Sequence, residues 1–165
     1  MNIENSHIFY AVLVGIGATV IMDLWALGAR RVLNVPSPNY CLVGRWLSHM
    51  PGGRFMHTSI VAAAKKNAEC AIGWGFHYVI GVVYVFLLVV PTSGRWLEQP
   101  TLTPALLVGI GTVLIPYFIM QPSFGLGIAA ARTANPAQAR VRSLMSHTAY
   151  GVGLYLAAIL VNRLV

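Results

Sequence analysis

The sequence has few charged residues and very few acids. Charged side chains make up 9% of its 165 residues, and only four residues are aspartate or glutamate. Soluble domains carry about 25% charged residues, so a soluble fold would lack the charges to cover its surface. Hydrophobic residues make up 57% of the chain. This composition excludes an ordinary soluble domain and predicts a membrane protein.

Several sequence motifs of catalysis and metal binding are also absent. The chain contains no G-x-S-x-G, no H-E-x-x-H, no paired C-x-x-C and no complete G-x-G-x-x-G. The sequence therefore gives no support to nucleophilic catalysis or to a dinucleotide loop. The two cysteines, Cys41 and Cys70, lie in a segment that we expect in the cytoplasm, where thiols stay reduced. We therefore expect no disulfide.

Four apolar segments reach the length of about 20 residues that a membrane-spanning helix needs. We expect spans at about 8–29, 71–90, 103–128 and 144–163. The first span contains Asp23, unlike a cleaved signal peptide, and we expect it to be retained. The prediction is an all-α fold, an integral membrane four-helix bundle that forms one membrane domain over residues 1–165.

The basic residues predict how the chain lies in the membrane. The loops at 30–70 and 132–143 hold nine Lys and Arg residues, whereas the opposite side holds only Arg95 and Arg163. The positive-inside rule then gives a cytoplasmic loop 30–70 in a bacterial inner membrane, with both termini periplasmic. The net charge of +7 fits this bias. We expect contacts with the bilayer and its anionic head groups, and none with nucleic acid.

The loop at 30–70 has helical character. Apolar residues recur at helical spacing between Ser37 and Met50, and a second short helix is expected between Thr58 and Cys70. Pro51, Gly52 and Gly53 predict a turn between the two. We expect both short helices to lie at the membrane surface.

A short sequence pattern occurs twice. Leu-Val-Gly-Ile-Gly stands at 13–17 and again at 107–111, and the spacing from His77 to Gly81 matches that from His147 to Gly151. The bundle is therefore interpreted as two helical hairpins in a parallel repeat, although Gly-rich apolar helices also resemble one another by chance.

Four polar residues fall at one depth in the predicted bundle. Because consecutive spans run in opposite directions, counting along each helix brings together Asp23, His77, Gln121 and His147. An acid within a span usually faces the bundle interior and finds a partner, here a ligand or a salt bridge to Arg30 or Arg31. Pro116 and Pro122 should bend the third span beside this level.

Three interpretations of these four residues stay open. His77 and His147 could ligate a haem iron or a transition metal. Together with Asp23 they could bind or move a cation, a proton or another small ligand. They could also hydrogen-bond only to one another and so fix the bundle. No cofactor is assumed.

A second group of polar residues lies in and beside the loop. It comprises Arg45, His49, Arg54, His57 and Glu69. These side chains could cap the polar level from the cytoplasm, with the two arginines attracting an anion; the alternative is a solvated interfacial loop.

Runs of residues along nearly the whole chain resemble one family. They are Gly17-Ala18-Thr19, Met22-Asp23-Leu24-Trp25, Gly44-Arg45-Trp46, Gly73-Trp74, His77-Tyr78, Pro100-Thr101, Met120-Gln121-Pro122 and Ser143-Leu144. This pattern resembles the bacterial membrane family catalogued as domain of unknown function 2938. The resemblance implies a small inner-membrane protein and supplies no catalytic residues.

The leading hypothesis is an inner-membrane protein with a polar site near the cytoplasmic face that binds or moves a small ion, proton or ligand. A role other than catalysis is favoured, and the question of enzymatic activity stays open. The alternatives are a haem- or metal-binding redox protein and a non-catalytic subunit or assembly factor. Four short helices enclose little volume, so we expect a transporter of this size to form a homo-oligomer.

Overall fold

The computed structural model describes residues 5–164 and contains helices and loops, with no strand over that range. The helices are α1 (Asn5–Leu33), α2 (Tyr40–His49), η1 (Met50–Gly52), α3 (Glu69–Thr92), α4 (Arg95–Glu98), α5 (Leu102–Gly111), η2 (Pro116–Met120), α6 (Gln121–Ser123), η3 (Ile128–Ala130) and α7 (Pro136–Leu164). Four stretches are long and apolar enough to cross a membrane: Ser6–Leu33, Glu69–Val89, Leu102–Ser123 and Pro136–Leu164. The predicted all-α four-helix bundle is confirmed.

The outer surface of the bundle is covered with large apolar side chains. Examples from all four spans are Leu24, Val79, Leu107 and Leu160, each more than half exposed. A soluble protein rarely exposes apolar patches of this extent, because apolar surface in water is unfavourable. These side chains identify the face that contacts lipid tails, and the chain is a membrane protein.

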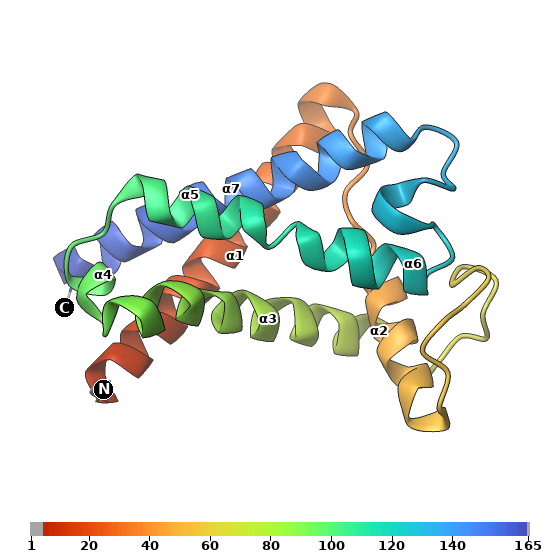
Figure 1. The fold of residues 1–165 in the computed structure, drawn as a ribbon, viewed down its shortest axis with the longest axis horizontal. Coiled ribbons are helices and arrows are strands. Elements are labelled where there is room, and N and C mark those ends of the chain that lie inside the picture. The colour runs from red at the N-terminus through yellow and green to blue at the C-terminus, as the bar shows by residue number, and fades with distance from the viewer. Residues whose placement is uncertain (1–4, 165) are drawn as a thin grey trace.

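The helices pack as two hairpins joined through α1 and α7. Helix α1 packs against α3 and α7, and α5 packs against α7, whereas α3 and α5 touch little. Both ends of the described chain lie at one end of the bundle, and α2 crosses its opposite end (Figure 1). The fold therefore has one end that holds both termini and an opposite end that is closed by α2.

Small residues bring the helix backbones close together. A Cβ atom on Gly15 would collide with Val82 of α3, and one on Gly109 would collide with Gly151 of α7. Such close approach is how helices associate in lipid, where apolar burial gives little drive. Each hairpin thus uses the first glycine of the repeated pattern to pack against its second helix, in agreement with a parallel repeat.

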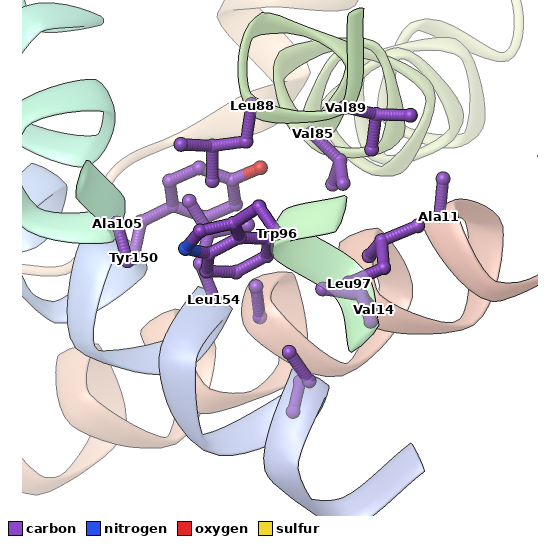
Figure 2. Packing of buried hydrophobic residues seen from close by; sticks show 13 residues of the cluster. Ala11, Val14, Val85, Leu88, Val89, Trp96, Leu97, Ala105, Tyr150 and Leu154 are labelled. Atoms are coloured by element: carbon purple, nitrogen blue, oxygen red, sulfur yellow. The ribbon is translucent and has the colours of Figure 1, made fainter. Parts of the chain in front are cut away.

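The main core lies at the end of the bundle that holds the termini. Trp96 and Leu97 of α4 insert among α1, α3 and α7, where they meet Val85, Leu88 and Leu154 (Figure 2). Trp96 also donates from its indole nitrogen to the carbonyl of Thr101 at 3.2 Å. The four-residue helix α4 therefore plugs this end of the bundle.

The third span is broken where the prolines predict a bend. Pro116 has no backbone N–H, so the regular ladder is interrupted there. The chain continues as a π-helix from Pro116 to Met120, and the N–H of Gln121 bonds the carbonyl of Pro116. This confirms the predicted irregular backbone and sets Gln121 directly after the wide turn.

Helix α2 crosses α3 with no room for side chains between them. A Cβ on Gly44 would collide with the carbonyl of Glu69, and one on Gly73 with the carbonyl of Tyr40. On the same two helix faces, three residues earlier, Cys41 and Cys70 form a disulfide. The expectation that no disulfide forms was wrong, because the crossing brings two sequence-distant cysteines within bonding distance.

The loop after α2 differs partly from the prediction. The expected helix between Ser37 and Met50 is present as α2, and the expected turn follows it, with Gly53 in the left-handed region (φ 75°). The second helix between Thr58 and Cys70 was wrong: this stretch forms turns, and α3 begins only at Glu69. Side chains of α2, described below, bond its carbonyls in place of a helical ladder.

The crossing of α2 and α3 predicts a position-specific glycine requirement. In Gly44→Val, the new side chain would collide with the α3 backbone. We expect the free energy of unfolding to fall by about 1–3 kcal/mol, a usual cost of overpacking. Thermal unfolding of the purified protein in detergent measures this change. The matched control is Gly75→Val on the open side of α3, where nothing lies within 4 Å of a Cβ. Equal melting temperatures for the two variants would contradict the described crossing.

Candidate functional site

A cavity of about 570 Å³ lies between the spans at the end that α2 closes. Its walls come from all four spans, from residues 35–38 of the connection between α1 and α2, and from Tyr40, Val43 and Trp46 of α2. Most of the lining is apolar, including Met22, Phe76, Ile80, Ile119 and Met145. The volume lies within the range of about 300–1,000 Å³ that is typical of small-molecule sites.

A few polar side chains interrupt this apolar lining. The second span contributes His77 and the third contributes Gln121. The helix of the fourth span contributes Arg142, Ser143, Ser146 and His147. Three of the four residues that we predicted at one depth therefore line a single cavity. The fourth, Asp23, does not line the cavity but is bonded to His77, which does.

Asp23 is bonded to two neighbouring residues of α3. One carboxylate oxygen lies 3.0 Å from Nε2 of His77, and the other accepts a hydrogen bond from the Tyr78 hydroxyl at 3.0 Å. The alternative of a salt bridge to Arg30 or Arg31 was wrong, because α3 supplies nearer partners. The carboxylate is thereby satisfied and fixes the orientation of the imidazole ring.

The His77 ring is also held from the α2 side. The ring of Tyr40 stacks on it, with centroids 3.9 Å apart, and Trp74 meets it edge-on at 5.8 Å. Burial, followed by the charge of Asp23, raises the pKa of the Tyr40 phenol well above its usual range, so this group stays neutral. The position of α2 therefore decides what covers His77.

His147 and Gln121 are bonded on the other side of the cavity. Nδ1 of His147 lies 2.9 Å from the hydroxyl of Thr112. Gln121 is 6% exposed, and its amide nitrogen is 3.4 Å from the Ser143 hydroxyl, a long contact. Its amide oxygen is buried and has no partner among the described residues. If the amide is turned over, the nitrogen becomes the unpaired atom, so one amide group lacks a partner in either orientation.

Arg142 brings a positive charge to the same wall. Its Nε is buried and has no hydrogen-bond partner within residues 5–164. The sequence analysis counted this residue among the basic residues at 132–143 and did not include it in the site; α7, which begins at Pro136, carries it to the cavity. The Asn135 side chain accepts from the N–H of Gln138 at 3.1 Å and so caps the start of this helix.

The second group of predicted residues organises the loop at 53–68. Nε and Nη2 of Arg45 bond the two carboxylate oxygens of Glu69 at 2.9 and 2.8 Å. Nη1 donates to the carbonyls of Ile60 and Val61. Hydrogen bonding to Glu69 raises the pKa of Arg45. All three guanidinium nitrogens of Arg45 therefore donate hydrogen bonds within the protein, so this side chain is not available to bind an anion.

His49, the last residue of α2, lies beside His57 of the loop that follows. Their ring centroids are 5.0 Å apart, and a ring nitrogen of His49 lies 2.9 Å from the Ala64 carbonyl. Nε2 of His57 is buried without a partner among the described residues. Burial, then the neighbouring His49 and Arg54, lower the pKa of His57. The Arg54 residue itself stays exposed.

No group of three or more His, Cys, Asp or Glu that could hold a metal ion occurs in the part of the chain that the structure describes. Nε2 of His77 already faces Asp23, and Nδ1 of His147 already faces Thr112. A metal or haem held by His77 and His147 stays a prediction.

Sequence reasoning missed four residues of the site. Tyr40, Tyr78, Thr112 and Ser143 contact the predicted polar residues, but none differs from ordinary core residues in its spacing. One signal was present for the α2 crossing: Cys-x-x-Gly occurs at 41–44 and again at 70–73. Matched small residues on two helices indicate a close contact.

A family model described as "Protein of unknown function (DUF2938)" matches residues 12–161 of the chain. No curated protein and no solved structure matches the chain.

Proposed function

We propose that this chain, which belongs to the DUF2938 family, is a membrane protein that binds a small amphipathic molecule in the cavity between its spans. The observation that carries the proposal is the cavity of about 570 Å³, apolar over most of its lining, with polar side chains from three spans facing it. A single chain encloses this volume, so binding requires no second copy.

The lining favours an amphipathic ligand over a bare ion. An ion in an apolar environment needs several charged or carbonyl ligands to replace its hydration shell. Asp23, the one acid near this level, is engaged by His77 and Tyr78 outside the lining. An apolar body packed on residues such as Ile80 and Met145, with a polar head on the unpaired groups, matches both parts of the wall.

Asp23 and His77 act together in this proposal. The carboxylate holds one imidazole nitrogen, so the ring presents a fixed edge to the ligand. Asp23 is thus a positioning residue, and His77 and His147 are the groups that face the ligand. Helix α2 acts as the cover, since Tyr40 and Trp46 close the cavity from that side.

We also propose that the loop at 30–70 faces the cytoplasm of a bacterial inner membrane, with both termini in the periplasm. The nine basic residues on that side support this orientation. A disulfide such as Cys41–Cys70 is typical of oxidising compartments and points the other way. In this proposal the nine basic residues outweigh the single disulfide as evidence for the orientation.

Filling the cavity should abolish binding. Ala26 lines the cavity, whereas its neighbour Leu27 is 41% exposed on the lipid side. For Ala26→Phe we expect the affinity for radiolabelled 1-dodecanol to fall about tenfold or more, because the ring occupies the ligand volume. The measurement is a scintillation proximity assay on purified protein in detergent.

The matched control for this measurement is Leu27→Phe, which adds a ring on the same helix but outside the cavity. It should bind 1-dodecanol as the wild type does. Equal binding by wild type and both variants would show partition into detergent and would defeat the proposal, as would no binding at all.

The orientation gives a separate prediction. In a Cys41→Ser, Cys70→Ser background, a cysteine at exposed Lys65 should react with a membrane-impermeant maleimide only after cells are permeabilised. A cysteine at Arg95, on the opposite side, should react in intact cells with an opened outer membrane. Reversed labelling of the two positions would overturn the cytoplasmic assignment of the loop.

A further inference from the structure

We infer that the molecule bound in the cavity is a single-chain amphiphile with an anionic oxygen head group, a carboxylate or a phosphate monoester, recognised by Arg142. This inference rests on the proposed function and names the class of ligand. It follows from a count of the charges around the cavity and from the unpaired groups on one wall.

Every acid in the described chain already has a partner elsewhere. Asp23 is bonded to His77, Glu69 to Arg45, and Glu98 lies 3.3 Å from His7 at the other end of the bundle. Arg142 is left with no carboxylate among residues 5–164, although it lines an apolar cavity. Because an arginine stays charged and is unfavourable in such surroundings without a counter-ion, the ligand is the natural source of the anion.

The neighbours of Arg142 complete a set of hydrogen-bond donors. Ser143 and Ser146 follow it on α7 and line the same cavity. Gln121 is 6% exposed and lines the cavity with one unpaired amide group. With the amide turned so that its oxygen faces the Ser143 hydroxyl, its nitrogen donates toward the cavity. Anionic oxygens accept hydrogen bonds from all of these groups, and a planar guanidinium suits a carboxylate or phosphate.

The rest of the cavity takes the apolar part of the ligand. The apolar part of the lining includes Trp25, Val43 and Ile80. A bare inorganic anion would leave this apolar surface empty, whereas an alkyl chain covers it. The protein surface near this end is basic, with Arg30, Arg31 and Arg132, so an anionic amphiphile is attracted to the same side.

The test compares three ligands that share one chain length. Purified protein in non-ionic detergent is titrated with radiolabelled dodecanoate, dodecyl phosphate and 1-dodecanol. For wild type we expect at least one anion to bind about tenfold or more tightly than the alcohol. A preference for dodecanoate identifies a carboxylate, and a preference for dodecyl phosphate identifies a phosphate monoester; either supports the inference.

Arg142→Gln should remove the anion preference, because it should weaken the binding of the anions about tenfold more than that of 1-dodecanol. Residual binding of 1-dodecanol shows that the variant is folded. Arg140→Gln is the matched control: Arg140 is exposed, and its Nε donates to the Ala129 carbonyl outside the cavity. This variant should keep the preference.

The remaining outcomes separate the two claims. Equal affinity of wild type for the alcohol and both anions overturns the anionic head group while the cavity site stands. An anion preference that survives in Arg142→Gln overturns the role of this residue. Absence of binding for all three ligands overturns the proposed function and the inference together.

Discussion

The docking of α2 across the end of the bundle is the contact on which the site depends. Two features hold it: the backbone approach at Gly44 and Gly73, and the bidentate pair of Arg45 and Glu69, whose side chains are 7% and 13% exposed. Water competes little for such a buried pair, and removal of one partner would leave a buried charge unsatisfied. Without this docking, Tyr40 would not stack on His77 and the cavity would have no cover.

The polar side chains within the spans follow from one further constraint. Lipid offers no hydrogen bonds, so each polar group must find a partner inside the protein or in a bound molecule. Asp23 meets this requirement through His77 and Tyr78, and His147 does so through Thr112. Within residues 5–164, one amide group of Gln121 and Nε of Arg142 have no partner, and both residues line the same cavity. In the proposed function, the ligand therefore lies at the unmatched groups rather than at the matched ones.

Much of the architecture could be predicted from sequence because hydrophobic length and helical rise act locally. The four spans, the break at Pro116 and the shared depth of His77, Gln121 and His147 all follow from counting residues along helices. The prediction was accurate for those features that the sequence of a single helix determines.

The parts that failed depend on how distant segments meet. The disulfide between Cys41 and Cys70 and the stacking of Tyr40 on His77 arise only once α2 docks on α3. The stretch at 58–68 lacks a helix because Arg45 and His49 bond its carbonyls, a competition that no local pattern reports. Arg142 was not predicted as a site residue, because only the packing of the helices brings it to the cavity.

The claim that the cavity holds an anionic amphiphile of the membrane is tested most directly by what the protein carries with it. The measurement is mass spectrometry of small molecules extracted from protein that has been purified from native membranes, for wild type beside Arg142→Gln. The account predicts that one class of single-chain anionic amphiphile is enriched in the wild type over the surrounding lipid and lost in the variant. A co-purifying lipid profile that matches the bulk membrane in both proteins would contradict it.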